Sequence, residues 1–438
     1  MNGEKLRAVS VILGDITVFY LSLALTVLAR YGWDKFGKWW ILHFFPFSAL
    51  FIVWVIVFWV AGLYDPLSFS ANQRARERII RAMLFAGVVS ITLFYVFPKI
   101  GIAPKTNLVI DLAVTIAFLI LWRKFYGLML SRSGKLRVLF LGFSAETEEL
   151  INFLKANPHL GYEPILSLKE NMPGLIRQKK ADLVIAPINI GDNSDFIRTL
   201  YEVLPLGVAY LNFPEFYERI TGKVPVSMIS EIWFLENLAE NRKRTYEVAK
   251  RAFDIAAGAV LSLITLIILP FAALAIKIDS RGPILFRQKR VGKNGRPFEL
   301  LKFRSTRRTE VPQSEGWQKE ENEDPYTKVG KFLRKNYIDE LPQVLNIMKG
   351  EMSLIGPRPE RPEFVEELKL KIPHYMMRLL VRPGISGWAQ IKMEYDASAT
   401  DALEKLQHDI FYIKNRSFGL DLAIAFKTLF TMISRPGR

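Results

Sequence analysis

Residues 255–276 read IAAGAVLSLITLIILPFAALAI, a run of 22 residues without a charged side chain. A straight helix of this length can cross a membrane core of about 30 Å. However, basic residues flank the run equally on both sides, whereas a crossing segment carries its excess on the cytoplasmic side. Pro270 also lies inside the run, where it removes a helical hydrogen bond and favours a kink. We therefore predict a re-entrant helix over about residues 253–278 that enters the membrane, bends at Pro270 and returns to the same face.

The alternative for this run is an ordinary membrane span. Every residue after Lys277 would then lie on the outer side of the membrane, away from cytoplasmic nucleotides. The flanking basic residues are Arg242, Lys243, Arg244, Lys250 and Arg251 before the run, and Lys277, Arg281, Arg287, Lys289, Arg290 and Lys293 after it.

Four further apolar stretches lie in the first third of the chain, over residues 8–28, 41–62, 79–97 and 107–122. The first two are long enough to cross a bilayer, and the last two are marginal. Basic residues are most frequent before the first stretch, between the second and third, and after the fourth, which places these segments in the cytoplasm. We predict a four-helix transmembrane bundle over residues 1–134, with both ends cytoplasmic and with Asp15 and Asp111 facing its interior.

The composition restricts the chemistry that the chain can perform. Lys and Arg number 59 against 43 Asp and Glu, a formal net charge of +16, and the mean hydropathy is +0.16. Basic charge beside apolar segments favours anionic lipid or phosphorylated substrates as partners, rather than nucleic acid. The absence of cysteine excludes disulfides, thiolate metal sites and a cysteine nucleophile. The four histidines are far apart in sequence, which excludes a zinc site of the H-x-x-x-H type.

Alternating strand and helix patterns follow the bundle and predict a Rossmann-like domain over residues 135–240. The predicted strands cover residues 136–143, 181–187 and 208–213, and the predicted helices cover residues 145–154 and 195–204. A dinucleotide-binding turn needs three glycines for a close approach to pyrophosphate, but the turn after the first strand has only Gly142. We therefore interpret this domain as a structural or regulatory module without a phosphate loop.

Specific polar residues are concentrated in the last third of the chain, in five short motifs. They are residues 288–295 (QKRVGKNG), 298–305 (FELLKFRS), 338–343 (IDELPQ), 352–360 (MSLIGPRPE) and 381–390 (VRPGISGWAQ). These motifs combine turn glycines, cations and two adjacent acids, which together suit a phosphorylated ligand.

The adjacent acids Asp339 and Glu340 point in different directions on a helix. One of them can attack a substrate while the other binds a metal ion or moves a proton. The alternative for this pair is a solvated first turn of a helix, followed by Pro342. Arg358 lies between two prolines that restrict its backbone, so its guanidinium is preorganised for phosphate; the alternative is a surface ion pair with Glu360.

Further cations in these motifs are candidates for substrate binding. Lys302 and Arg304 alternate with apolar residues, so we expect both on one face of a strand. Arg378 and Arg382 lie on or near an amphipathic stretch around residues 375–380. This stretch is either an interfacial membrane helix or a helix packed on its own domain.

Together the five motifs resemble the bacterial sugar transferases, also described as polyprenyl-phosphate hexose-1-phosphate transferases or monotopic phosphoglycosyl transferases. The resemblance runs from about Lys250 to the C-terminus and contains all five motifs in order. The whole chain is similar to the large subfamily, in which four spans and a degenerate Rossmann-like domain precede the catalytic domain. Residues 216–225 and 232–236 also resemble that subfamily. Thr306 and Ser386 depart from the family pattern without removing a charged group.

The resemblance implies a membrane α/β fold: a four-helix transmembrane bundle, a degenerate Rossmann-like domain, and a small α/β catalytic domain over residues 241–438 with the re-entrant membrane helix. It implies a multi-pass protein of the bacterial inner membrane, with the catalytic domain on the cytoplasmic face. The implied activity is transfer of a sugar-1-phosphate, a hexose by preference, from a UDP-sugar to undecaprenyl phosphate with release of UMP. This step initiates O-antigen, capsule or exopolysaccharide synthesis. The oligomeric state is left open, with a homodimer as one alternative.

The resemblance also implies roles for individual residues. Asp339 would attack the phosphate that carries the sugar and form a phosphosugar-aspartyl intermediate, which the polyprenyl phosphate then attacks. Mg²⁺ is the implied cofactor, held by Asp339 and Glu340 with phosphate oxygens and waters. The implied substrate-binding residues are Lys302, Arg304, Arg358, Arg378, Arg382 and Gln390.

Three other functions are weighed against this one. A nucleotide-sugar glycosyltransferase would carry an Asp-x-Asp metal motif, and no two aspartates of this chain are two positions apart. A non-enzymatic membrane scaffold of polysaccharide assembly would not need Asp339 and Glu340 beside so many cations. A membrane-bound nucleotide-sugar dehydratase would use Tyr246 and Lys250 as a Y-x-x-x-K pair, but the glycine-rich loop that should precede them is missing.

Overall fold

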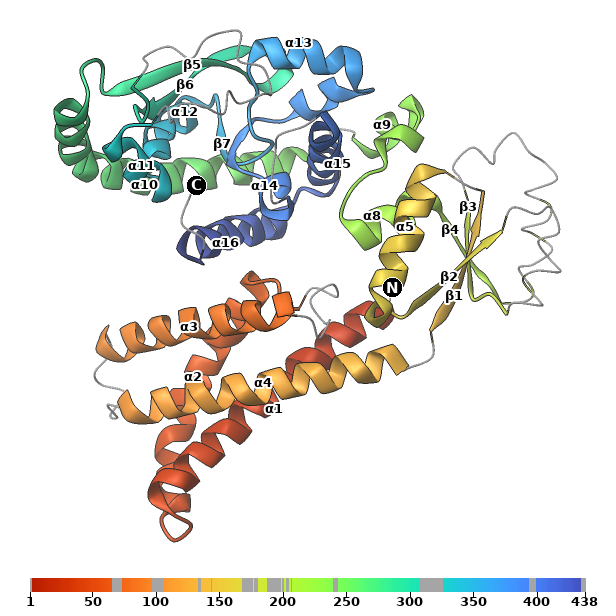
Figure 1. Ribbon diagram of the computed structural model, residues 1–438, viewed down its shortest axis with the longest axis vertical. Coiled ribbons are helices and arrows are strands. Elements are labelled where there is room, and N and C mark those ends of the chain that lie inside the picture. The colour runs from red at the N-terminus through yellow and green to blue at the C-terminus, as the bar shows by residue number, and fades with distance from the viewer. Residues whose placement is uncertain are drawn as a thin grey trace. The chain divides into compact units, whose positions relative to one another are not determined.

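The computed structural model of the chain folds as two compact units, residues 1–211 and residues 212–438 (Figure 1). The structure describes residues 2–64, 73–96, 105–132, 135–142, 144–167, 176, 180–186, 198, 201, 205, 207–238, 243–307, 326–393 and 399–434.

The first unit begins with helices α1 (Asn2–Tyr31), α2 (Phe36–Val60), α3 (Gln73–Val96) and α4 (Lys105–Arg132). Helix α1 packs against α2 and α4, and α3 packs against the same two helices. In the described part of the chain, α1, α2 and the later helix α10 are long and apolar enough to cross a membrane. Helices α3 and α4 contain the two apolar stretches that are marginal by length.

Polar side chains inside these helices are paired with one another. Arg123 of α4 donates to both carboxylate oxygens of Asp15 of α1, at 3.1 and 2.5 Å. Ser22 of α1 donates to Asp111 of α4 at 2.8 Å. Both acids are fully buried, so the prediction that they face the interior is confirmed. Such pairing stabilises polar groups that have been removed from water.

A sheet completes the first unit, with its strands in the order β2 (Tyr162–Ser167), β1 (Leu136–Leu141), β3 (Leu183–Ala186) and β4 (Ala209–Asn212). Strand β1 is parallel to both neighbours, with Val138 opposite Pro164 and Leu183. Helix α5 (Ala145–Ala156) follows β1, and the Ser144 hydroxyl caps it by accepting from the Thr147 amide at 3.1 Å. The predicted α/β region with a parallel sheet is therefore confirmed.

Strand β2 was not predicted from the sequence. Its sequence, YEPILS, contains Pro164, which cannot donate to a neighbouring strand and therefore weakens the strand pattern. The strand lies at an edge of the sheet, where a proline is tolerated because one side has no partner. Most of the predicted helix 195–204 and part of the turn after β1 lie outside the described residues.

The second unit begins at Asn212, before the domain boundary at residue 240 that the sequence predicts. Its first elements are α8 (Phe213–Thr221) and α9 (Glu231–Asn237). The turn after α8 bonds to residues far along the chain: Val224 donates to the Gln407 carbonyl at 3.1 Å, and the Trp388 indole donates to the Gly222 carbonyl at 2.9 Å. These long-range contacts have no local sequence pattern, and they join α8 to the second unit. The domain boundary at residue 240 stays a prediction.

The second unit continues with helix α10 (Arg244–Asp279) and the antiparallel hairpin of β5 (Leu285–Val291) and β6 (Pro297–Phe303). Strands β7 (Ser353–Ile355) and β8 (Gly384–Ser386) form a parallel pair. Further helices are α11 (Lys328–Lys335), α12 (Val344–Lys349), α13 (Pro362–Lys371), α14 (Trp388–Lys392), α15 (Ala399–Asn415) and α16 (Phe418–Ser434). An apolar cluster of Phe298, Leu300, Ile347 and Met352 joins β6 to α12 and the start of β7.

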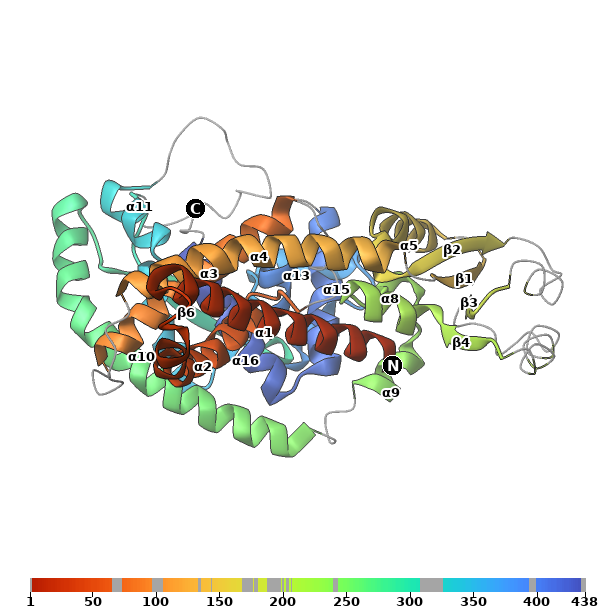
Figure 2. The same ribbon diagram turned by 90° about the horizontal axis from the view of Figure 1, so that it is seen from below.

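Helix α10 is bent, and Figure 2 shows its two arms at an angle to each other. Pro270 lies inside the helix and removes one hydrogen bond, which accounts for the bend. Both ends of α10 contact the same unit. Lys243, at the first end, donates to the Ile413 carbonyl at 2.9 Å, and Asp279, at the second end, accepts from the Val329 amide at 2.9 Å. Between these ends the most apolar part of the helix is only 11% buried.

Candidate active site

The acidic pair lies on a single 3₁₀ turn, Ile338–Gln343, between α11 and α12. Tyr337 precedes the turn with a φ of 56°, in the left-handed region that favours glycine, and redirects the chain after α11. Pro342 and Gln343 are buried and fix the far end of the turn. Both carboxylates are therefore carried by a short element that is fixed at each end.

Two cations from different segments hold Glu340. Lys302 Nζ, on β6, lies 2.8 Å from Glu340 Oε1, and Arg358 Nη2 lies 3.0 Å from the same oxygen. Burial raises the pKa of Glu340, but the charges of Arg358 and Lys302 outweigh this and lower the pKa to about 2. Glu340 is therefore ionised at every physiological pH, and its orientation is fixed.

Asp339 has a different environment. It is buried, with 7% of its surface exposed, and no described residue forms an ion pair with its carboxylate or donates a hydrogen bond to it. Burial raises the pKa of Asp339, and the charge of Lys302 opposes this only in part. Its oxygens keep their lone pairs available for an electrophile, whereas Glu340 Oε1 is engaged by two cations. Of the two acids, Asp339 is thus better suited to attack and Glu340 to hold charge.

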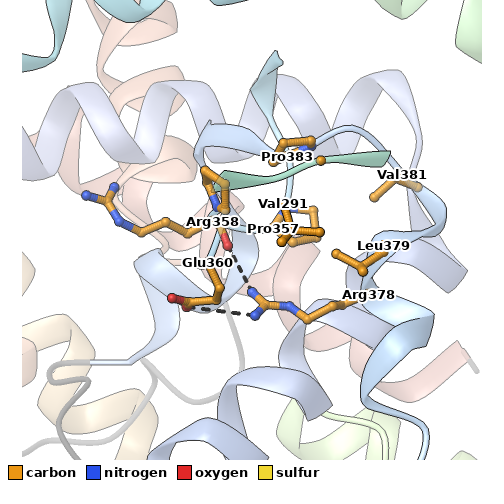
Figure 3. A pocket seen from close by; sticks show the side chains of 10 residues that line it. Val291, Pro357, Arg358, Glu360, Arg378, Leu379, Val381 and Pro383 are labelled. Carbon is orange, nitrogen blue, oxygen red and sulfur yellow. Dashed lines mark hydrogen bonds and ion pairs between the residues drawn. The ribbon is translucent and has the colours of Figure 1, made fainter. Parts of the chain in front are cut away.

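Arg358 extends from a loop whose backbone is fixed at three successive carbonyls. The carbonyls of Pro357, Arg358 and Pro359 accept from the Gly384 amide at 2.9 Å, Arg378 Nη2 at 3.0 Å and Arg290 Nη1 at 2.9 Å, respectively. Figure 3 shows the Arg358 side chain pointing away from Arg378. Its ion pair is formed with Glu340, and not with Glu360 as the alternative from the sequence would have it.

Comparison with known proteins gives the family of this chain. Residues 245–435 match the model of a family described as "Bacterial sugar transferase". A protein of Caulobacter vibrioides named UDP-glucose:undecaprenyl-phosphate glucose-1-phosphate transferase is 39% identical over 191 residues, which are 43% of this chain and 71% of that protein. The chain belongs to the bacterial sugar transferase family.

Other relatives of this chain differ in how much of their length is matched. Exopolysaccharide production protein PSS of Rhizobium leguminosarum bv. phaseoli is 38% identical over 197 residues, 43% of this chain and 96% of that protein. An Aeromonas hydrophila protein named UDP-N-acetylgalactosamine-undecaprenyl-phosphate N-acetylgalactosaminephosphotransferase is 39% identical over 258 residues, 58% of this chain. The matched part spans 60% of the length of the Aeromonas protein.

Arg378 lies inside the protein and not against the acidic pair. It is 3% exposed, lies 2.8 Å from Asp409 and donates to the Tyr375 hydroxyl at 2.6 Å. The 3₁₀ helix that carries it, Tyr375–Leu380, also buries Tyr375, which supports packing on its own domain for this stretch. In the structure Arg378 acts on the site through the backbone of Arg358.

Three more predicted residues also bond to backbone carbonyls. Strand β6 ends at Phe303, and Arg304, which follows it, is 2% exposed and donates to the Ser280 carbonyl at 2.7 Å, at the end of α10. Arg382 donates to the Gly350 carbonyl at 3.0 Å, and Gln390 donates to the Ile385 carbonyl at 3.1 Å. Of the predicted substrate-binding residues, the structure thus brings Lys302 and Arg358 to the acidic pair. Substrate contacts of all six residues stay predictions.

The Y-x-x-x-K pair has a structural role in this chain. The Tyr246 hydroxyl and Lys250 Nζ both lie 2.7 Å from the same carboxylate oxygen of Asp421. Lys250 and Asp421 are almost fully buried, so this network anchors α10 to α16. It gives no support to the dehydratase alternative.

A second charged cluster, centred on Glu360, lies beside Arg358 and was not predicted from the sequence. Lys405 Nζ lies 2.6 Å from Glu360, and Arg378 and Arg290 lie 3.8 and 3.9 Å from it. Burial raises the pKa of Glu360, but the charges of Lys405 and Arg378 outweigh this and lower it. The available signal was on α15, where Lys405 and Asp409 are four residues apart, a spacing that places opposite charges on one helix face.

Proposed function

We propose that the chain transfers a sugar-1-phosphate from a UDP-sugar to undecaprenyl phosphate and releases UMP, which starts a lipid-linked polysaccharide such as an O-antigen, capsule or exopolysaccharide. The observation that carries the proposal is the contrast between the acids. Asp339 is buried and has no ion-pair partner among the described residues, and next to it Glu340 is fixed by two cations. The names of the relatives support the substrate class, since they specify UDP-glucose or UDP-N-acetylgalactosamine as donor and undecaprenyl phosphate as acceptor.

The proposed reaction has two steps at one phosphorus atom. A carboxylate oxygen of Asp339 attacks the phosphorus that carries the sugar, and the bond from this phosphorus to the bridging oxygen breaks, so that UMP leaves. An oxygen of undecaprenyl phosphate then attacks the same phosphorus, and the bond to Asp339 breaks to regenerate the carboxylate. Lys302 and Arg358 would stabilise the negative charge that accumulates on the phosphate oxygens.

Magnesium fits this site together with a substrate. The described residues contain no group of three or more acidic or histidine side chains that could hold a metal ion, so the acidic pair supplies at most two protein ligands. Mg²⁺ commonly takes one or two carboxylates and completes its shell with phosphates and waters. We propose Asp339 and Glu340 as these ligands. When bound, the ion would neutralise phosphate charge.

The test of this function is the identity of the released nucleotide. The full chain in detergent micelles is incubated with undecaprenyl phosphate, Mg²⁺ and single UDP-sugars, including UDP-glucose and UDP-N-acetylgalactosamine. The proposal requires UMP to be released with at least one sugar and a lipid-linked sugar diphosphate to form. Release of UDP would indicate a glycosyltransferase, and no product with any donor would favour the scaffold alternative.

The pKa values of the two acids predict the acid limb of the pH profile. Asp339 must be ionised to attack, so the rate of UMP release should fall as the pH drops through the Asp339 pKa, which burial raises above its usual 3.8. Glu340, with a pKa of about 2, stays ionised over this range. The fall in rate at low pH should therefore follow the protonation of a single group. The negative charge of Glu340 contributes to the raised pKa of Asp339. In Glu340→Gln the limb should therefore move to lower pH, and a limb that stays in place or moves up would contradict the assignment.

We also propose that α10 is re-entrant and that α1–α4 form a transmembrane bundle in the bacterial inner membrane. Two observations support a re-entrant α10. The helix contains Pro270 and is bent, and both of its ends contact the same folded unit. A span that crossed the bilayer would separate its two ends by the membrane thickness, and one unit on one face could not hold both.

Cysteine labelling tests this topology in a chain that has no cysteine of its own. Arg244→Cys and Lys277→Cys place exposed thiols at the two ends of α10, and Trp33→Cys, at a position 79% exposed between α1 and α2, is the control for the opposite face. The outer membrane of the cells is permeabilised and the inner membrane is left intact. We expect a maleimide that cannot cross the inner membrane to label position 33 alone. Labelling at position 277 but not at 244 would show that α10 crosses.

A further inference from the structure

One buried face of α10 contacts the segments on both sides of the candidate active site. Lys250, Asp254 and Gly258 are spaced four residues apart, lie on this face and are buried. The helix packs against α12, which follows the acidic pair, and against β7, which precedes Arg358.

Asp254 holds the strand that leads to Arg358. Its Oδ1 accepts hydrogen bonds from the Ser353 hydroxyl at 3.0 Å and from the Leu354 amide at 3.0 Å, and both donors belong to β7. The chain runs from the end of this strand at Ile355 through Gly356 and Pro357 directly to Arg358. The position of β7 therefore fixes where the loop with Arg358 begins.

On the other side, α10 is fixed to the helix that follows the acidic pair. Arg251 donates to two carbonyls in the last turn of α12, Ile347 at 2.7 Å and Met348 at 2.9 Å. At Gly258 a Cβ atom would lie 3.0 Å from the Met348 sulfur, so the two helices approach closely there. The helix α12 begins directly after the turn with Asp339 and Glu340. The contacts of α10 with α12 therefore also restrict the position of the acidic pair.

The Asp254 side chain is retained at an energetic cost. It is 1% exposed, and its Oδ2 is buried without a hydrogen-bond partner in the described part of the chain. A buried oxygen without a partner destabilises a protein, so an apolar residue would suit a position that served packing alone. The hydrogen bonds of Oδ1 with β7 show what the carboxylate contributes: it holds β7 against α10.

We propose that Asp254 is a positioning residue, which sets the place of Arg358 relative to Glu340 and so the affinity of the site for the diphosphate of its nucleotide substrate. The proposal rests on the proposed function, because it takes the diphosphate of a UDP-sugar as the ligand of Arg358. It makes the membrane helix α10 part of the active-site geometry, in addition to a means of attachment.

Binding of UDP to the full chain in micelles, measured by calorimetry, tests the proposal. Asp254→Ala removes the acceptor of two hydrogen bonds, and we expect the Kd of UDP to rise about tenfold. Asp254→Asn keeps an oxygen at the same place and should restore a Kd within about twofold of the original. Ser353→Ala should weaken binding, whereas the matched control Ser262→Ala should not, since among the described residues the Ser262 hydroxyl bonds only to Gly258 of its own helix.

A double variant separates positioning from general destabilisation. If Asp254 acts through Arg358, then Asp254→Ala combined with Arg358→Ala should bind UDP no more weakly than Arg358→Ala alone. Multiplied effects of the two changes would overturn the proposal, and so would an Asp254→Ala variant with unchanged affinity.

Amide hydrogen exchange supplies a measurement that needs no nucleotide. In Asp254→Ala the peptide over residues 353–360 should exchange faster, while the hairpin of β5 and β6 should not change. If the exchange over residues 353–360 does not change, the positioning role is wrong, whatever the affinity of the variant for UDP. Faster exchange in a protein that releases no UMP from any UDP-sugar would support the positioning of Arg358 and refute the proposed function alone.

Discussion

Asp339→Asn is expected to lower the rate of UMP release by about a thousandfold or more, because it removes the proposed nucleophile. The amide has nearly the shape of the carboxylate but cannot form a bond to phosphorus at a useful rate. The fold should not suffer, since both cations of the site are paired with Glu340 and no described residue depends on the Asp339 carboxylate. The variant should therefore unfold at the same temperature as the original protein. The exposed acid Asp34 provides the control Asp34→Asn, which should keep full activity.

The decisive measurement is mass spectrometry of the peptide that contains Asp339. With a UDP-sugar and Mg²⁺ present and the lipid acceptor withheld, the peptide of the original protein should gain the mass of one sugar phosphate. Addition of undecaprenyl phosphate should remove this adduct, and Asp339→Asn should never acquire it. An adduct on another residue, or near-normal UMP release by Asp339→Asn, would contradict the two-step mechanism. A direct in-line transfer with both substrates bound would then be the better account.

The acidic pair and its two nearest cations could be predicted from sequence because each belongs to a short motif with an evident chemistry. Arg358 between two prolines and Asp339 next to Glu340 are of this kind. Motif membership alone did not reveal the direction of a side chain, however. Arg304 and Arg378 carry the same charge as Lys302 and Arg358, yet both are buried and hold backbone carbonyls. Whether an arginine is buried depends on contacts with residues distant in sequence, which form only in the folded unit. Local sequence patterns therefore do not predict it.

The fold shows the same division between local and long-range information. Apolar runs and strand patterns predicted the first helices and three of the strands, because periodicity is a local property. Strand β2 escaped prediction because Pro164 interrupts its pattern, and its place at a sheet edge is what tolerates the proline. The cluster around Glu360 escaped because Lys405 and Asp409 come from α15, far along the chain from the motif that they support.

The domain boundary leads to the second prediction with a large expected effect, on two truncated chains. A chain from Asn212 to Arg438 keeps the whole second unit, whereas a chain from Lys243 lacks α8 and α9. We expect the longer chain to show a cooperative thermal transition in micelles and the shorter one to lose it. Both should be purified in the same detergent and compared by circular dichroism and by UMP release.

The physical reason is the amount of buried surface that the shorter chain would expose. Within α8, Phe216 is 1% exposed and Tyr217 is fully buried, and each such aromatic side chain contributes roughly 1.5–3 kcal/mol when it is removed from water. Glu218 of the same helix accepts from Lys414 and Asn415 of α15, at 2.6 and 2.7 Å. A typical domain is stable by only about 5–15 kcal/mol, so the loss of several such contacts is enough to unfold it. Tyr217→Ala in the full chain tests the same packing without a deletion and should lower the unfolding temperature of the second unit.

If the chain from Lys243 unfolds at the same temperature as the chain from Asn212 and releases UMP as fast, then α8 and α9 are dispensable and the boundary predicted from sequence is the functional one.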